Sequence, residues 1–110
     1  MQPSVFFKCL ADDTRLRLLF LLLGQKELCV CDLHEALDIS QPKASRDLAD
    51  LRKCGLVLDE RKGRWMYYRL HPALPAWARE VILLTKVANA DYITGCEVRL
   101  TQFRLCEDDK

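Results

Sequence analysis

The fold of this chain is decided by the stretch Asp32-Leu33-His34-Glu35-Ala36-Leu37-Asp38-Ile39-Ser40-Gln41-Pro42-Lys43-Ala44-Ser45-Arg46-Asp47-Leu48-Ala49-Asp50-Leu51-Arg52-Lys53. Asp32 and Glu35 have the spacing of a capping box, which predicts a helix that begins at Asp32 and runs to about Leu37. Ser40 is the next N-cap candidate, and Pro42 is tolerated in a first helical turn. The stretch therefore predicts two short helices joined by a tight turn.

The second of these helices is expected to run to about Lys53 and to end at Gly55. Ala44, Leu48 and Leu51 form one apolar stripe along it. The polar residues expected to point away from this stripe are Lys43, Arg46, Asp47, Asp50 and Lys53. Two short helices, the second with polar groups at its N-terminal end, form a helix-turn-helix pattern at about residues 32–54.

A β-hairpin is predicted directly after the helix-turn-helix, at about residues 56–70. Leu56–Arg61 and Arg64–Leu70 are rich in β-branched and aromatic residues, as strands are. Lys62-Gly63 between them reads as a two-residue turn, in which Gly supplies the positive φ. A basic hairpin in this position is the wing of a winged helix, and its tip can reach backbone phosphate or the minor groove.

Helices are expected on both sides of this unit. The first is short and centred on Phe6–Ala11, and the second, capped by Asp12 or Asp13, runs from about Thr14 to Leu23 and forms the centre of the core. A long helical pattern from about Pro75 to Leu105 carries more apolar surface than one small domain can bury. We therefore expect one domain, residues 1–110, mainly α with a β-hairpin. It should dimerise through its N- and C-terminal helices, the latter at about 75–105.

The distribution of charge favours a local nucleic-acid surface. The net charge is only +1, yet residues 41–69 hold eight basic and four acidic side chains. Basic residues gathered in a helix-turn-helix and its hairpin fit phosphate binding. The candidate base and phosphate contacts are Gln41, Lys43, Ser45 and Arg46 on the second helix of the pair and Arg61, Lys62 and Arg64 on the hairpin.

The N-terminal sequence predicts a cytoplasmic protein. Residues 1–4 lack the basic region and apolar core of a signal peptide, and the apolar run Leu16–Leu23 is too short to cross a bilayer. In a reducing compartment, the six cysteines are more often buried residues, metal ligands or redox groups than disulfides. No general base pairs with a cysteine in an obvious way and no cofactor loop is present, so we expect no enzyme and no resident cofactor.

Cys29 and Cys31 are the candidate metal ligands. Thiolates select soft acceptors such as Zn, Cu(I), Cd, Pb and trivalent arsenic or antimony. In a regular helix two residues at this spacing point about 200° apart, whereas in an extended segment they point to the same side. The pair can therefore chelate only if this helix end is extended or unwinds. An ion that clamps both sulfurs would then displace the helix-turn-helix and release DNA.

Other residues could complete or replace this site. Two small buried cysteines at a helix end are the plain alternative to a metal site. His34 lies one helical turn after Cys31 and could add a ligand, although a lone histidine there is more often a surface residue. Cys9, Cys54, Cys96 and Cys106 are expected to be ordinary buried or surface cysteines.

Four motifs together resemble the ArsR/SmtB family of metalloregulatory repressors, and most closely its arsenical-resistance operon repressors. These motifs are Ala11-Asp12-Asp13-Thr14-Arg15-Leu16-Arg17, Glu27-Leu28-Cys29-Val30-Cys31-Asp32-Leu33, Ser40-Gln41-Pro42-Lys43-Ala44-Ser45-Arg46-Asp47-Leu48 and Gly63-Arg64-Trp65-Met66-Tyr67-Tyr68-Arg69-Leu70. The resemblance, from Phe6 to about Trp77, implies a homodimeric winged-helix repressor. Such a repressor leaves double-stranded operator DNA on binding As(III) or Sb(III), its inducers.

The resemblance also implies a ligand set from which this chain departs. Cys29 and Cys31 match the first two cysteines of the family motif, but His34 stands where the third would be. Either His34 binds, or two sulfurs suffice with a small third ligand, or a remote cysteine joins. Cys96 and Cys106 are the remote candidates, and they could also form a separate site if the helix breaks, for which Gly95 is the candidate.

Three rival functions remain open. Cadmium/lead sensors of the same family carry a similar cysteine pair but take further cysteines from an N-terminal arm. The zinc sensors are not among them, because they use Asp and His ligands on the last helix and residues 85–104 contain no histidine. From other classes, the chain could be a redox switch in which Cys29 or Cys31 oxidises, or a small thiol enzyme. The operator, the metal ranking and the response to methylated arsenicals are not encoded in any recognisable motif.

Overall fold

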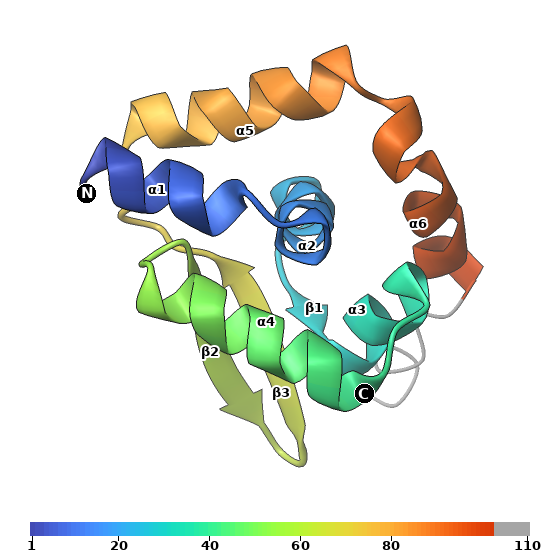
Figure 1. Ribbon diagram of the computed structural model, residues 1–110. Coiled ribbons are helices and arrows are strands. Elements are labelled where there is room, and N and C mark those ends of the chain that lie inside the picture. Colours follow the sequence, from blue (N-terminus) through green and yellow to red (C-terminus); the bar gives the residue numbers. More distant parts are fainter. Residues whose placement is uncertain (103–110) are drawn as a thin grey trace.

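The computed structural model describes residues 1–102 and consists of helices packed around one small sheet (Figure 1). Its elements in order are α1 (Pro3–Leu10), α2 (Asp13–Leu23), β1 (Leu28–Cys29), α3 (Val30–Leu37), α4 (Gln41–Lys53), β2 (Val57–Lys62), β3 (Trp65–Leu70), α5 (Ala76–Ala88) and α6 (Asp91–Gln102). The described part of the chain is mainly α with a β-hairpin, as the sequence predicts.

Helix α2 is the centre of the core, with the other helices around it (Figure 1). Asp12 is its N-cap, and Oδ2 of Asp12 accepts a hydrogen bond of 3.0 Å from the backbone N–H of Arg15. Five consecutive residues, Leu18–Leu22, are buried. A helix that is apolar nearly all round must be covered on every side, and this is why α3, α4, α5 and α6 all pack against it.

The helix-turn-helix consists of α3 and α4, joined by residues 38–40. The turn is tight because Asp38 adopts the left-handed conformation, with a φ of 57°. Ser40 is the N-cap of α4, as predicted, and its Oγ accepts a hydrogen bond of 3.2 Å from the backbone N–H of Lys43. The prediction that Asp47 points away from the core is wrong. Its place one turn after Ala44 puts it at the edge of the buried stripe, where Lys43 pairs with it.

The end of α4 leads directly into the wing. Gly55 has a φ of 79°, and the backbone N–H groups of Gly55 and Leu56 donate to the carbonyls of Arg52 and Leu51. This is a Schellman motif, in which a residue without a Cβ adopts the left-handed conformation at little cost. The chain thereby reverses into β2 while the last carbonyls of the helix remain bonded.

The hairpin turn lies one residue later than predicted. Strands β2 and β3 are antiparallel, and Lys62 pairs with Trp65, so the two turn residues are Gly63 and Arg64. Gly63 has a φ of 63°, and Arg64 does not have a positive φ. A glycine with positive φ at the first turn position fits a type II′ turn, which matches the twist of the two strands. This preference accounts for the shift in register.

The C-terminal helical pattern is broken where one continuous helix was predicted. α5 ends at Ala88, α6 begins at Asp91, and the chain turns sharply between them at Asn89 (Figure 1). The break allows α6 to fold back along α2 and α3 and to bury Ile93, Cys96 and Leu100. Gly95, the predicted point of a break, lies inside α6. Leu105, the predicted helix end, lies outside the described residues.

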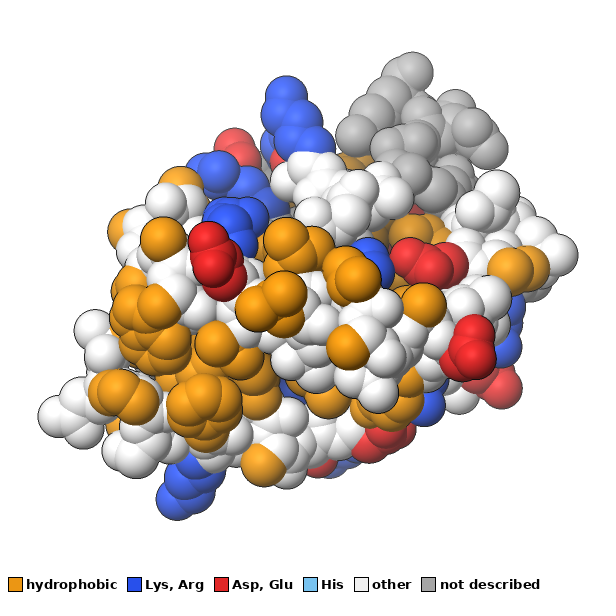
Figure 2. Space-filling model, turned by 90° about the horizontal axis from the view of Figure 1, so that it is seen from above, with side chains coloured by type: hydrophobic (Ala, Val, Ile, Leu, Met, Phe, Trp, Pro, Cys, Tyr) orange, Lys and Arg blue, Asp and Glu red, His pale blue; other side chains and the backbone are white. Residues whose placement is uncertain are grey.

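An apolar face remains open on the side of the molecule formed by α1 and α5. Figure 2 shows hydrophobic side chains gathered on this face. The two helices lie side by side, since the rings of Phe6 and Trp77 are 5.0 Å apart between centroids. The large exposed apolar residues of α1 and α5 are Val5, Phe7, Trp77, Leu83, Leu84 and Val87. Within residues 1–102, no helix has the length and apolar character needed to span a bilayer.

Candidate soft-metal site and nucleic-acid interface

Cys29 belongs to two elements at once. Its backbone lies in β1 and pairs with Tyr67 of β3, so β1 is the third strand of the wing sheet. Its side chain is the N-cap of α3, because Sγ accepts a hydrogen bond of 3.4 Å from the backbone N–H of Cys31. Cys29 is completely buried, with an exposed fraction of 0%. The residue therefore connects the start of the helix-turn-helix to the wing.

The sulfurs of Cys29 and Cys31 lie 2.7 Å apart. Cys29 is extended, with a ψ of 149°, whereas Cys31 is in the first turn of α3, and this change of conformation brings the two side chains together. The predicted capping box is wrong: α3 begins at Val30, and Asp32 lies buried in its first turn. The physical reason is that the thiol of Cys29 already caps the helix, three residues before the predicted cap Asp32.

His34 lies on α3, partly buried, one turn beyond this pair. Its Nδ1 is 3.1 Å from the carbonyl oxygen of Ile39, a contact that helps to close the turn after α3. Among residues 1–102, no three His, Cys, Asp or Glu side chains converge into a set that could hold a metal ion. His34 as a third ligand stays a prediction, and in this conformation the ring contacts the turn.

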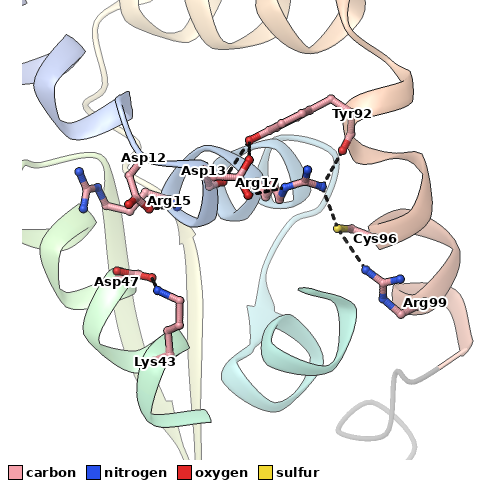
Figure 3. A network of polar contacts seen from close by, with 9 residues as sticks. All are labelled: Asp12, Asp13, Arg15, Arg17, Lys43, Asp47, Tyr92, Cys96 and Arg99. Carbon is pink, nitrogen blue, oxygen red and sulfur yellow. Dashed lines mark hydrogen bonds and ion pairs between the residues drawn. The ribbon is translucent and has the colours of Figure 1, made fainter. Parts of the chain in front are cut away.

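Cys96 lies on α6, where two arginines contact its sulfur (Figure 3). Nη1 of Arg17 is 3.7 Å and Nη2 of Arg99 is 3.6 Å from Sγ of Cys96, whose exposed fraction is 2%. Nη1 of Arg17 also donates 2.7 Å to the carbonyl of Tyr92, and Nε of Arg99 donates 2.7 Å to the carbonyl of Ala36 near the end of α3. The two arginines thus tie α6 to α2 and α3 around this sulfur. Cys106 lies outside the described residues.

The candidate DNA contacts of α4 gather at its N-terminal end. Gln41 and Arg46 are exposed, and Ser45 is half-buried. Nζ of Lys43 is 3.3 Å from Oδ2 of Asp47, so this lysine is held along the helix by an i,i+4 ion pair. Pro42 has no N–H and the backbone N–H of Lys43 donates to Ser40, so the donors available at this end of α4 are mainly side chains.

The wing presents Arg61, Lys62 and Arg64, all exposed. Nζ of Lys62 donates to both carboxylate oxygens of Glu27, at 2.9 and 2.6 Å. These hydrogen bonds raise the pKa of Lys62. Nζ also lies 5.3 Å from the centre of the Tyr67 ring. An ion pair thus holds Lys62 of the wing against Glu27, the residue directly before β1 and the cysteine pair.

Sequence reasoning missed Glu27 and Tyr67 as parts of this site. Glu27 immediately precedes β1, and Tyr67 is the strand partner of Cys29. Alternation along Trp65–Leu70 indicates a strand, but it cannot reveal that a two-residue strand from another part of the chain pairs with it. Lys62, the basic partner of Glu27, was already a candidate DNA contact. The opposite charges of these two residues were the one available signal for their contact.

The comparisons with known proteins agree with this arrangement. Residues 12–58 match the model of the family described as "Bacterial regulatory protein, arsR family". These residues include α2, the cysteine pair and the whole helix-turn-helix.

Two curated relatives are regulators of arsenic resistance. The chain is 47% identical to the arsenic resistance transcriptional regulator ArsR1 of Pseudomonas putida over 102 residues. This match covers 93% of this chain and 80% of that protein. It is 58% identical to the arsenical resistance operon repressor of Escherichia coli K12 over 80 residues. This match covers 73% of this chain and 68% of that protein.

Solved structures show the same winged helix-turn-helix fold. The AntR antimony-specific transcriptional repressor superposes with a TM-score of 0.68 at 31% identity, over 80% of this chain and 77% of that one. A homodimeric winged helix-turn-helix DNA-binding domain from Mycobacterium bovis superposes with a TM-score of 0.66 at 28% identity, over 82% of this chain and 80% of that one.

Proposed function

The chain belongs to the ArsR family of bacterial transcriptional regulators, and on this premise we propose that it is a repressor whose homodimer leaves operator DNA on binding trivalent arsenic or antimony. Its relatives are transcription regulators rather than enzymes. The observation that carries the metalloid part of the proposal is the contact between the sulfurs of Cys29 and Cys31 at the start of α3.

DNA binding is proposed for the exposed end of α4 together with the wing. α4 would enter the major groove, where Gln41 and Arg46 read base edges and Lys43 and Ser45 contact phosphate. Arg61 and Arg64 would hold the flanking backbone or minor groove, and Lys62 would join them when its ion pair with Glu27 opens. The exposure of the wing residues supports this assignment.

The proposed homodimer uses the open face of α1 and α5. Six large apolar side chains exposed on two adjacent helices exceed what a monomer normally leaves in water. A two-fold axis through this face would place two α4 helices on two half-sites of the operator. The homodimeric M. bovis domain supports this assembly.

The metalloid is proposed to bind both sulfurs at the start of α3. Zinc lies about 2.3 Å from a thiolate sulfur, so a soft ion of similar size can reach both sulfurs from one position if the pair opens slightly. Soft acceptors favour such thiolate sites over oxygen or imidazole ligands. Arsenic is favoured over cadmium because the two arsenic resistance regulators are 47% and 58% identical over 93% and 73% of this chain, whereas a cadmium resistance regulator among the relatives is 41% identical over 60% of it. The antimony-specific repressor supports antimony as a second inducer.

Cys106 is our proposed third ligand. The sulfur of Cys96 is buried between two arginines, and His34 contacts the turn after α3. The end of α6 comes close to the connection before β1, since Leu100 and Thr101 line one surface hollow together with Gln25. Cys106 follows Gln102 by four residues, a length that spans at most about 14 Å. We propose Cys106 for this role because the side chains of Cys96 and His34 already have partners in the fold.

Release from DNA would follow from loss of the helix cap. An ion bound to Sγ of Cys29 competes with the N–H of Cys31 for the same sulfur. Opening the pair to hold the ion would shift the first turn of α3, and with it the short turn to α4. Because Cys29 also pairs with Tyr67, the same movement would reach the wing.

The test is release of the protein from operator DNA by arsenite under reducing conditions. The double variant Cys29→Ser, Cys31→Ser should bind the operator like the wild type and should no longer be released by arsenite. Cys96→Ser, at a sulfur that lies between Arg17 and Arg99 outside the proposed site, serves as the matched control and should respond normally. If arsenite still released the double variant from the operator, the assignment of the pair would be refuted. If cadmium but not arsenite released the wild-type protein, the chain would be a cadmium/lead sensor instead.

A redox switch at the same pair is the second candidate, because two sulfurs in contact are suitably placed for oxidation. Release by peroxide in the absence of arsenite, reversed by dithiothreitol, would support that function instead.

A further inference from the structure

A second pair of cysteines meets at the C-terminal end of α4. Cys9 comes from α1, and Cys54 is the C-cap residue of α4. Sγ of Cys9 lies 3.9 Å from the backbone carbonyl oxygen of Asp50, and the backbone N–H of Cys54 donates to the same oxygen at 3.1 Å. Two residues that are far apart in the sequence thus converge on one carbonyl group.

The two thiols interact directly. Burial, a hydrogen bond with the Cys54 thiol and the charge of Cys54 together raise the pKa of Cys9 to about 12, with a smaller contribution from the charge of Asp50. The nearby guanidinium of Arg15 acts in the opposite direction. Cys9 has an exposed fraction of 4%, and Cys54 is the more accessible of the two. The pair therefore has one buried sulfur and one that a ligand can reach.

A surface pocket leads to both residues. The pocket has a volume of about 400 Å³ and is lined by Cys9 and Cys54 together with Val5, Lys8, Arg15 and Lys53. The carboxylate of Asp50, which also lines it, lies 4.0 Å from Nη1 of Arg15. A small ligand can therefore approach the thiols without entering the core around α2.

We propose that Cys9 and Cys54 form a second dithiol site, separate from Cys29 and Cys31, that binds one trivalent arsenical. In the reaction, two S–H bonds and the arsenic–oxygen bonds break while two As–S bonds form. The two thiol protons leave with the oxygen as water, and arsenic stays trivalent, so no oxidant or reductant is needed.

The chemistry of the pair favours an arsenical over a divalent cation. A divalent cation needs thiolates, so its binding must release the thiol protons to solvent. That release is unfavourable at neutral pH for a thiol as weakly acidic as Cys9. An arsenical brings its own proton acceptor, the oxygen that departs as water. The proposed ligand of this site is therefore a trivalent arsenical that carries oxygen.

Occupancy of the site would join α1 to the C-terminal end of α4. α1 is short, eight residues, and the bridge would bind it to the helix proposed to read DNA. The folded protein should consequently become more stable when the site is filled, because the fold holds the two thiols close together and therefore binds the ligand more tightly than the unfolded chain does.

The experiment uses the full chain with Cys9 and Cys54 as the remaining cysteines (Cys29→Ser, Cys31→Ser, Cys96→Ser, Cys106→Ser). It is incubated with phenylarsine oxide in a phosphine reductant, which prevents disulfides, and is examined by native mass spectrometry and thermal melting. We expect one phenylarsenic group per chain, bound with loss of one water, and a higher Tm. The matched control (Cys9→Ser, Cys29→Ser, Cys31→Ser, Cys106→Ser) keeps Cys54 and Cys96, and should bind no arsenical.

The proposal is overturned if the Cys9/Cys54 protein binds no more phenylarsine oxide than the control while circular dichroism shows it folded. It is also overturned if binding occurs only in urea, since two thiols on an unfolded chain can always meet. If the quadruple variant does not fold, the same comparison is made between the wild type and Cys9→Ser, and the proposal fails if both take up the same number of groups. No DNA is used, so failure here leaves the function proposed for Cys29 and Cys31 untouched.

Discussion

At the scale of single residues, Cys29 has two separable tasks. Serine can replace the sulfur as a helix cap because its Oγ accepts a hydrogen bond in the same position, whereas alanine cannot. We expect the free energy of unfolding of Cys29→Ala, measured by urea titration, to be about 1 kcal/mol lower than that of Cys29→Ser. The loss of a helix N-cap costs about this much. Equal stability of the two variants would show that the contact between Sγ and the N–H of Cys31 does not stabilise α3.

Both substitutions remove the sulfur, so both should abolish the response to arsenite. The pair thus distinguishes the structural task of the residue from its proposed chemical one.

Cys9 predicts a specific dependence of stability on pH. Its pKa is about 12 in the folded protein against 9.0 for an unperturbed thiol, so the folded state holds this proton more tightly. The resulting stabilisation is fully present below pH 9 and is lost as the pH rises toward 12. Between pH 8 and about 10.5, we therefore expect the unfolding free energy to fall less in Cys9→Ala and Cys9→Ser than in the wild type. Parallel curves for the three proteins would contradict this account.

At the scale of elements, the ion pair of Lys62 with Glu27 links the wing to β1. Glu27→Gln would leave Lys62 free to contact phosphate. We expect tighter binding to DNA of any sequence, and a slope of log K against log salt that steepens by about 0.9 for one added phosphate contact. Fluorescence anisotropy over a series of salt concentrations measures both quantities.

The matched control for this change is Glu80→Gln, which removes the same charge from an exposed position on α5. If the two variants gained affinity equally, the effect would come from net charge rather than from Lys62.

At the scale of the whole molecule, the open face of α1 and α5 determines the assembly. Leu84 is 65% exposed, so Leu84→Arg should leave the fold of the protomer intact while placing a charge in the proposed dimer interface. We expect this variant to sediment as a monomer and to lose most of its operator affinity. Val98→Arg, on the outer side of α6, is the control and should remain dimeric. If the Leu84→Arg protein remained dimeric, the dimer interface would have to lie elsewhere on the molecule.

The sequence predicted the fold well where a signal is local. Ser40 and Asp12 cap the helices as expected, because an N-cap is a contact between near neighbours. The errors arose where distant segments decide the outcome. The break at Asn89 serves the packing of α6 on α2 and α3, and the two-residue strand β1 exists only through its pairing with β3.

The candidate site shows the same limit. The cysteine pair was evident from its spacing, but its conformation depends on β3, which holds Cys29 extended. The meeting of Cys9 with Cys54 had no signal in the sequence, because neither residue lies in a motif and the contact is created by the packing of α1 beside α4. Cys54 and Cys9 were accordingly expected to be ordinary cysteines.

The pairing of Cys29 with Tyr67 has a consequence for the order of events in a cell. If the metalloid loosens the hold on DNA through this sheet, DNA must by the same free energy loosen the hold on the metalloid. Protein already seated on its operator would then be the last to take up the ion, and free protein would take it up first. A cell with surplus repressor would respond only after that surplus was saturated, so the amount of protein, as well as its affinity, would set the threshold of the response.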